Sequence, residues 1–525
     1  MKEQNNANNY KKWLTIVSVI LAAVLCIQGV YMAGGFGKSG NAAQTEQKAE
    51  ETAVQSEGAE AQADSGTQAA EPEAASGGAG EAGAEGDTES EPAQDGQEAA
   101  FPTVMQAAEV PGSLSHEGYT LEQVLVFSRH NIRSPLKGNR DMMATVTPHE
   151  WFEWSSDSSE LSVRGGDMEV HVGQFFRKWL EAEGLFPTNY HPEEGAVRIY
   201  ANSKQRTIAT AQFFDSGLLP TANIPVEYHG TFGDHNPDFH TKLTFCSDSY
   251  SDAVKKQIAE VYGSQLSALA DNYELLADVA DIEESEAFKS GEFTGFSVDD
   301  TEMTYENDKE PSMKGSLKTG CAVADAMILQ LYEMADASDA AFGNNLTFEQ
   351  WKQLSEIKDL YNDIMFATPL VAYNVANPLL KLMRSELTEE GRQFTLLCGH
   401  DANIASFLTC LKAEEYELPA TVETRTPIGG KVVFSKWRGA DGEEMMSVDL
   451  VYASTEQLRD LSLLDLRNHP VIVPLSFEGL EKNEDGLYKA ADVLERFDEA
   501  ISEYDRIVEQ YSETESDESA LDEAA

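Results

Sequence analysis

The feature that most constrains the fold is a short apolar run that stops at a histidine between two arginines, in Leu125-Val-Phe-Ser-Arg-His-Asn-Ile-Arg-Ser-Pro135. Residues 124–127 are β-branched and aromatic, which is typical of a buried strand, and the proline that closes the stretch prevents a long continuation. We therefore expect Arg129, His130 and Arg133 just past the carboxyl end of a buried strand, where open α/β sheets bind ligands.

This triplet has the chemistry of a phosphate site. Two confined guanidiniums repel each other unless an anion lies between them, and the planar arginine fork matches phosphate. An imidazole between them can attack phosphorus with one nitrogen if a backbone carbonyl holds the other, which gives a covalent phosphohistidine. The alternative is a basic surface cluster with a capping histidine, so other parts of the chain must decide between the two.

A second strand-turn-helix pattern spans residues 197–214. Residues 197–201 alternate like a strand, and Asn202 or Ser203 is a suitable cap for the helix that follows. Arg206 then falls in the first helical turn, where free N–H groups and the helix dipole already favour an anion. Taken alone, an arginine at this place is more often a solvated surface residue.

A third pattern spans residues 394–408, where an apolar strand and Gly399 precede an apolar-faced helix. His400 can donate a hydrogen bond to a phosphate oxygen. Asp401, held near an anion, can remain protonated and supply a proton to a leaving oxygen. Asp401 can alternatively be a simple helix cap. Three strand ends with matching Arg, His and Asp residues favour the phosphate site.

Composition limits the kinds of partner. The chain has 525 residues and 41% apolar residues, which is ample for a core, but 91 acidic residues oppose 38 basic ones and give a net charge of −53. Nucleic acids and acidic membrane surfaces are therefore poor general partners, and no nucleic-acid partner is expected. No Cys/His spacing resembles a zinc site, and no cofactor is expected.

The amino terminus predicts a membrane anchor. Residues 13–32 are uncharged and mostly apolar and follow two lysines, and their length matches a bilayer core. We expect a cytoplasmic stub at 1–12, an anchor or uncleaved signal at 13–35, and an extracytoplasmic remainder at the cell membrane. A cleaved secretory signal, which would leave a secreted or periplasmic protein, is the alternative.

The remaining boundaries follow from composition. Residues 36–116 are rich in Ala, Gly, Glu and Ser and predict a disordered acidic linker. The folded domain is expected at 117–509 and an acidic tail at 510–525. Cys246, Cys321, Cys398 and Cys410 allow two disulfides or none, with Cys398 expected as a buried thiol.

The motifs Arg-His-x-x-Arg-x-Pro, Asn-Ser-x-Gln-Arg-Thr and Gly-His-Asp-x-Asn-Ile, with Glu423-Thr-Arg-Thr-Pro-Ile-Gly-Gly-Lys431, resemble the histidine acid phosphatases. That branch of the histidine phosphatase superfamily includes bacterial phytases, and the chain most resembles its glucose-1-phosphatase subfamily. The resemblance implies a phosphoglycerate-mutase-like, three-layer α/β core with a mostly helical cap at about 231–366.

The resemblance also implies roles for individual residues. His130 would be the nucleophile and Asp401 the proton donor, and the phosphate would be bound by Arg129, Arg133, Arg206 and His400. Glu310 matches a carboxylate that faces the sugar, although a solvated acidic loop explains it nearly as well.

The expected function is a metal-independent, extracytoplasmic phosphomonoesterase that acts on small phosphate esters, with glucose 1-phosphate favoured. The alternatives are an inositol phosphate phosphatase, or an inactive receptor for phosphorylated ligands.

Overall fold

A computed structural model of the chain describes residues 110–522. The expected cytoplasmic stub, the membrane anchor and most of the acidic linker lie outside these residues. Within 110–522, no helix is long and apolar enough to cross a membrane.

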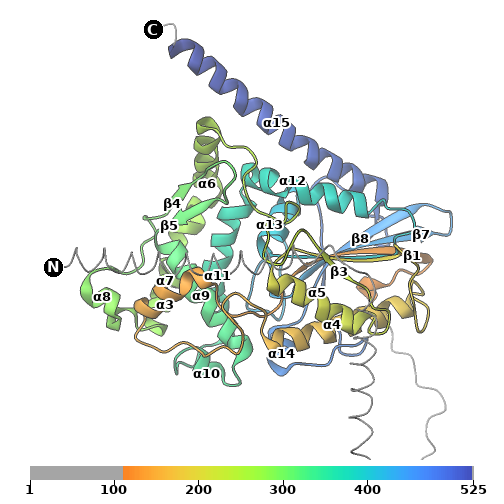
Figure 1. Cartoon of the computed structure of the whole chain (residues 1–525), viewed down its shortest axis with the longest axis horizontal. Helices are drawn as coiled ribbons and strands as arrows, with labels where there is room; N and C mark the ends of the chain where they lie inside the picture. Colours follow the sequence, from red (N-terminus) through yellow and green to blue (C-terminus); the bar gives the residue numbers. More distant parts are fainter. Residues whose placement is uncertain (1–109, 523–525) are drawn as a thin grey trace, which may run out of the picture. The chain divides into compact units, whose positions relative to one another are not determined.

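A mixed eight-stranded sheet forms the centre of the fold (Figure 1). Its strand order is β10-β8-β7-β1-β6-β2-β3, and β9 pairs with β8. The pairs β1–β6, β6–β2 and β2–β3 are parallel, and the other pairs are antiparallel. The strands are β1 (Tyr119–Arg129), β2 (Val197–Ala201), β3 (Val226–Tyr228), β6 (Phe394–Gly399), β7 (Lys431–Gly439), β8 (Glu444–Tyr452), β9 (Val471–Pro474) and β10 (Tyr488–Lys489).

The three strands predicted from the motifs are neighbours. Arg129 at the end of β1 is in register with Gly399 at the end of β6, and Ala201 of β2 is in register with Cys398. Because parallel strands end at the same edge of a sheet, the residues that follow β1, β2 and β6 meet at one place.

Helices cover both faces of the sheet. In Figure 1, α4 (Val163–Ala182) and α5 (Gln205–Leu218) lie on one face, and α12 (Pro369–Glu386), α13 (Asp401–Cys410) and α15 (Ala490–Asp522) lie on the other. Side chains of β1 alternate between the two layers: Val124 and Val126 belong to the core that contains α4 and α5, whereas Leu125 and Phe127 pack with α12 and α13. The predicted α/β class is confirmed, and the arrangement has three layers.

Two glycines let α4 and α5 pack backbone to backbone. A Cβ atom at Gly173 would lie 2.1 Å from the carbonyl oxygen of Phe214, and one at Gly217 would lie 2.1 Å from that of Val170. Any side chain at either position would push the helices apart, and α5 carries Arg206 in its first turn.

A second group of helices lies to the left of the sheet in Figure 1, mostly between β3 and α12. The short helix α3 (Arg140–Val146), which follows β1, lies among them. A π-helical turn, Asp363–Ala367, leads from this group into α12. The other members are α6 (Asp248–Ala268), α7 (Ala270–Val279), α8 (Glu286–Ser290), the hairpin of β4 (Glu302–Thr304) and β5 (Ser312–Lys314), α9 (Ser316–Glu333), α10 (Ala337–Ala340) and α11 (Phe348–Asn362).

The ends of the folded part differ from the expected boundaries. Leu114, which we placed in the linker, is 1% exposed, and its carbonyl oxygen accepts a 2.8 Å hydrogen bond from the indole of Trp179. The fold thus begins before residue 117, because this buried indole needs a hydrogen-bond acceptor.

At the other end, α15 continues to Asp522 instead of stopping near 509, since an established helix gains one hydrogen bond per added residue.

Candidate active site

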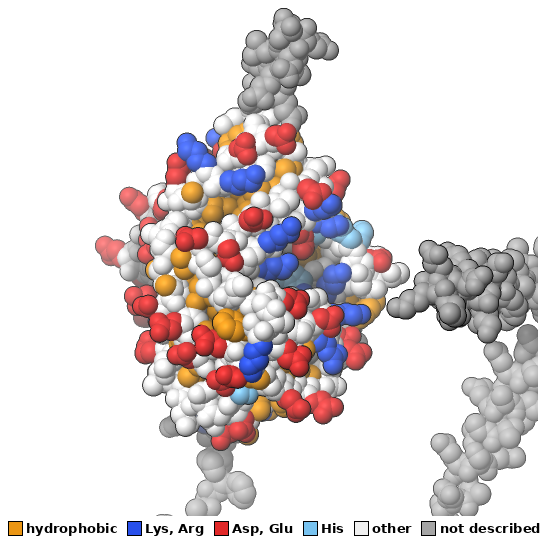
Figure 2. Space-filling view, turned by 90° about the vertical axis from the view of Figure 1, so that its left-hand side faces the viewer, with side chains coloured by type: hydrophobic (Ala, Val, Ile, Leu, Met, Phe, Trp, Pro, Cys, Tyr) orange, Lys and Arg blue, Asp and Glu red, His pale blue; other side chains and the backbone are white. Residues whose placement is uncertain are grey.

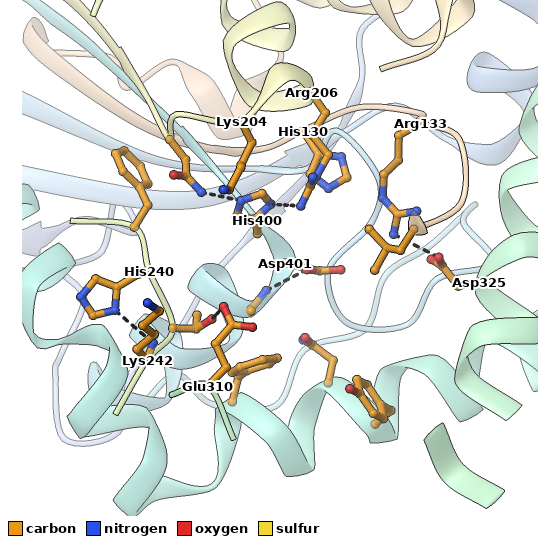
Figure 3. Close-up of a pocket in the computed structure, with 18 of the residues that line it drawn as sticks. His130, Arg133, Lys204, Arg206, His240, Lys242, Glu310, Asp325, His400 and Asp401 are labelled. Carbon is orange, nitrogen blue, oxygen red and sulfur yellow. Dashed lines mark hydrogen bonds and ion pairs between the residues drawn. The ribbon is translucent and has the colours of Figure 1, made fainter. Parts of the chain in front are cut away.

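A cavity of about 540 Å³ opens at the edge where β1, β2 and β6 end. It lies in an otherwise acidic surface: in Figure 2, Lys and Arg side chains gather beside a hollow, while Asp and Glu side chains cover much of the surrounding face. Figure 3 shows the lining side chains. Those that we predicted from the sequence are His130, Arg133, Arg206, Glu310, His400 and Asp401.

His130 is 2% exposed and follows the last residue of β1. Its Nδ1 lies 2.9 Å from the carbonyl oxygen of Asn131. A carbonyl only accepts hydrogen bonds, so Nδ1 carries the proton and Nε2 keeps a lone pair. Burial, followed by the positive charges of Arg206 and Arg133, lowers the pKa of His130 well below its usual value. The ring is therefore neutral, which is the state that can attack phosphorus.

Arg129 is 1% exposed and is held by two carboxylates. Its Nη2 lies 3.1 Å from Oδ2 of Asp401, and its Nη1 lies 2.8 Å from Oε1 of Glu423. Arg129 does not line the cavity. In this arrangement its guanidinium directly orients Asp401.

Arg133 and Arg206 face the cavity beside His130 (Figure 3). Arg133 makes a 3.0 Å ion pair with Asp325 of α9. Burial, and then the charge of Arg133, lowers the pKa of Arg206 to about 10. Two guanidiniums that repel each other in a buried place favour an anion between them.

His400 connects the second and third motifs. Its Nδ1 lies 3.3 Å from Nη2 of Arg206, and its Nε2 lies 2.7 Å from the side-chain amide of Asn202. The guanidinium of Arg206 and the amide nitrogen of Asn202 are both donors, whereas a neutral imidazole has one acceptor nitrogen, so the ring accepts a hydrogen bond from only one of the two. Burial and the charge of Arg206 lower the pKa of His400 well below its usual value.

Asp401 is the first residue of α13, and its side chain is 29% exposed. Burial raises its pKa, but Arg129 and then Lys358 outweigh that effect and hold the pKa below its usual range. This differs from our expectation of a protonated carboxyl. The expectation assumed a bound anion, and a phosphate dianion beside Asp401 would offset these cations and raise its pKa.

The sequence reasoning missed the buried carboxylate network behind Asp401. Glu423 is 1% exposed and accepts hydrogen bonds or ion pairs from Arg129, Lys358 (2.9 Å), Tyr332 (3.1 Å) and the backbone N–H of Ile428 (2.7 Å). Lys358 also lines the cavity. Only the stretch 423–431 carried a signal for this network, whereas Lys358 lies in helix α11 without any motif.

A second buried network lies behind His130. Asn131 donates from its amide to Oε1 of Glu169 at 2.7 Å, and the ammonium of Lys431 lies 3.0 and 3.1 Å from the two oxygens of that carboxylate. The side chains of Glu169 and Lys431 are both 0% exposed. This network holds Asn131, whose carbonyl oxygen in turn fixes the ring of His130.

We expect Lys431→Met to lower the free energy of unfolding by about 3–5 kcal/mol, because it leaves the carboxylate of Glu169 buried without its cation. Urea denaturation followed by circular dichroism measures the loss. Adding Glu169→Gln should restore part of it, since that substitution removes the uncompensated charge. The exposed lysine variant Lys256→Met on α6 is the control and should unfold like wild type. A Lys431→Met protein as stable as this control would contradict the account.

Comparison with known proteins agrees with this geometry. Residues 120–453 match the family described as Histidine phosphatase superfamily (branch 2). The chain belongs to this family. A glucose-1-phosphatase of Salmonella typhimurium is 38% identical to this histidine phosphatase over 389 residues, which are 73% of this chain and 93% of the relative. A glucose-1-phosphatase of Providencia rettgeri is 34% identical over 372 residues, or 70% of this chain and 88% of the relative.

Solved structures of phytases are similar to this histidine phosphatase in fold. The phytase from Citrobacter braakii superposes with a TM-score of 0.66 and 26% identity over 74% of this chain and 98% of its own. The Hafnia alvei phytase in complex with myo-inositol hexakis sulphate gives the same values. The resemblance found from the motifs is confirmed: the protein is a hydrolase of the histidine acid phosphatase type.

Proposed function

We propose that this phosphatase hydrolyses sugar phosphates, with glucose 1-phosphate favoured, through a phosphohistidine formed at His130. The observation that carries the proposal is the state of His130: its Nδ1 is bound by a carbonyl, its pKa is lowered, and it lines a cavity beside two arginines. A neutral imidazole with a free nitrogen next to an anion site is arranged for attack on a phosphate ester.

The reaction proceeds in two displacements. Nε2 of His130 forms a bond to phosphorus as the ester P–O bond breaks, and Asp401 gives its proton to the departing alcohol oxygen. Asp401 then accepts a proton from water, whose oxygen attacks phosphorus and releases phosphate and the free histidine. Arg133, Arg206 and His400 face the phosphate oxygens, where charge accumulates in each transition state.

Glu310 supports a sugar as the alcohol part of the substrate. It is an exposed residue that lines the cavity, and Oγ1 of Thr241 donates a 2.9 Å hydrogen bond to its Oε1. The remaining lone pairs of the carboxylate can accept hydrogen bonds from sugar hydroxyls. Two relatives named glucose-1-phosphatase, at 38% and 34% identity, support the same substrate.

Inositol phosphates are the second candidate, because three further lysines line the cavity: Lys204, Lys242 and Lys318. Cations at the mouth of a pocket favour a substrate with several phosphates. A phytase of Escherichia coli is 28% identical over 391 residues.

We also propose that the enzyme works outside the cytoplasm, held at the cell membrane by residues 13–35. The support is the uncharged, apolar run of residues 13–32 after two lysines.

Phosphate release from glucose 1-phosphate and from phytate, measured in EDTA, tests the proposal. We expect the wild-type enzyme to prefer glucose 1-phosphate. Glu310→Gln should raise the KM for glucose 1-phosphate by about 3- to 10-fold, because a charged acceptor of hydrogen bonds is lost. Glu306→Gln, which alters an exposed carboxylate paired with Lys309, is the matched control and should keep the wild-type KM.

A wild-type preference for phytate would assign the enzyme to the inositol phosphatases and leave the two-step chemistry unchanged. Turnover of neither ester would contradict the proposed function. An unchanged KM in Glu310→Gln would remove Glu310 from the sugar site.

A further inference from the structure

Most of the lysines and arginines that line the cavity make no ion pair with a carboxylate within the described residues. Lys358 contacts Asp359 and Glu423, and Arg133 contacts Asp325. Lys204, Lys242 and Lys318 make no ion pair within residues 110–522. In a chain with 91 acidic and 38 basic residues, carboxylates are abundant, so unpaired lysines in a cavity indicate a place kept for an anionic ligand.

Two of these lysines lie on the same side of the cavity as a histidine. In Figure 3, Lys204, His240 and Lys242 lie on the side of His400 that is away from Arg133. Lys204 precedes α5, and its ammonium donates a 2.9 Å hydrogen bond to the carbonyl oxygen of Gly233. The two other residues lie in the segment after β3, so two stretches of chain form this side of the cavity.

The hydrogen bonds of His240 leave one ring nitrogen free to donate to a ligand. Its Nδ1 accepts from the backbone N–H of Lys242 at 3.0 Å, so the neutral ring carries its proton on Nε2. No hydrogen-bond partner of Nε2 is present among the described residues. The ring of His235 packs edge-on against His240 with centroids 4.4 Å apart, which limits the movement of the ring.

The electrostatics of this group also favour an anion. Burial first, and then His235 and Lys242, lower the pKa of His240 to about 4, because a further positive charge is unfavourable there. The carboxylates Asp238 and Asp308 act on His240 less strongly than His235 and Lys242 do, and Asp238 accepts a 2.7 Å hydrogen bond from Tyr200. Glu310 also lies beside this group and accepts a 2.9 Å hydrogen bond from Thr241.

We propose that Lys204, His240 and Lys242 form a second phosphate subsite, so that the cavity also takes sugar bisphosphates and binds them more tightly than the glucose 1-phosphate that it favours over inositol phosphates. The first phosphate faces His130, and the second lies between the two ammonium groups and the imidazole N–H. Three donors, two of them charged, match the oxygens of a phosphate. This inference rests on the proposed function, because it specifies the substrate class of the same cavity.

Binding to the full-length His130→Ala protein tests the subsite without turnover. Calorimetry with glucose 1-phosphate and glucose 1,6-bisphosphate compares two ligands that differ only in the second phosphate. We expect the bisphosphate to bind at least about tenfold more tightly. The advantage should disappear when Lys204→Ala and Lys242→Ala are added, and it should remain when Lys256→Ala on α6 is added instead. Equal affinities for the two esters, or an advantage that survives the double substitution, would overturn the subsite.

Inorganic phosphate distinguishes an anion subsite from a contact with another part of the bisphosphate. We expect two phosphate sites per chain, one of which is lost in the double lysine variant. A single site in the chain with both lysines intact would overturn the proposal.

Turnover of glucose 1-phosphate by wild type tests the proposed function separately. A protein that turns over neither ester but still binds the bisphosphate more tightly through these lysines would refute the function and keep the subsite.

Discussion

Replacing His130 by alanine is expected to lower kcat for glucose 1-phosphate by at least about 10⁴-fold, because the substitution removes the nucleophile on which both displacements depend. The cations of Arg133 and Arg206 remain, so inorganic phosphate should still bind. Initial rates of phosphate release and calorimetric titration with phosphate measure these two quantities. His191→Ala, which removes an exposed imidazole, is the control and should retain wild-type rates. If His130→Ala kept more than a tenth of the wild-type kcat, a different group would be the nucleophile.

The second large effect is expected for Asp401→Asn. An amide keeps the shape of the side chain and cannot donate a proton to a leaving oxygen, so kcat for sugar phosphates should fall by about 10²- to 10⁴-fold. p-Nitrophenyl phosphate needs no such proton, because its leaving group is a stable anion at neutral pH. For that ester the first displacement should be nearly normal, and rapid mixing with substrate in excess should show a burst of nitrophenolate before a slow steady state.

Asp401 also makes an ion pair with Arg129, so a loss of stability has to be separated from a loss of chemistry. Urea denaturation of Asp401→Asn gives its free energy of unfolding, and calorimetry gives its affinity for phosphate. An equal loss of the first displacement for both esters would show that Asp401 positions Arg129 instead of donating a proton.

The strands that position the site could be predicted from the sequence. Short β-branched and aromatic runs at 124–127, 197–201 and 394–398 each end in polar residues, and the structure forms β1, β2 and β6 there. These strands are adjacent and parallel, so the ends that carry His130, Arg206 and His400 converge. The local pattern of apolar residues was sufficient to predict these three strands, because buried strands differ from loops in composition and length.

The state of the site depends on contacts between distant parts of the chain, and local patterns do not show these. Asp401 is ionised because of Arg129 and Lys358, and Glu423 is 294 residues away from the arginine that it binds. Lys358 lies on a helix with no recognisable motif, so its contact with Glu423 could not be predicted.

The boundaries of the fold were also predicted only approximately. Leu114 follows a long stretch of polar composition, and nothing nearby indicates that it is buried beside Trp179. The acidic residues near the end of the chain indicated a tail, whereas α15 extends through them to Asp522. At the first boundary the packing of Trp179 determines the structure, and at the second the preceding part of α15 does. Composition alone reveals neither of these.

Trapping the covalent intermediate tests the central claim most directly. Wild-type enzyme mixed with glucose 1-phosphate labelled with ³²P is quenched within milliseconds in alkaline denaturant, which preserves phosphohistidine, and the labelled peptide is located by mass spectrometry. The account predicts acid-labile, base-stable label on His130, and no such label on the His130→Ala protein. Rapid turnover without labelled protein, or label on another residue, would contradict a phosphohistidine at His130.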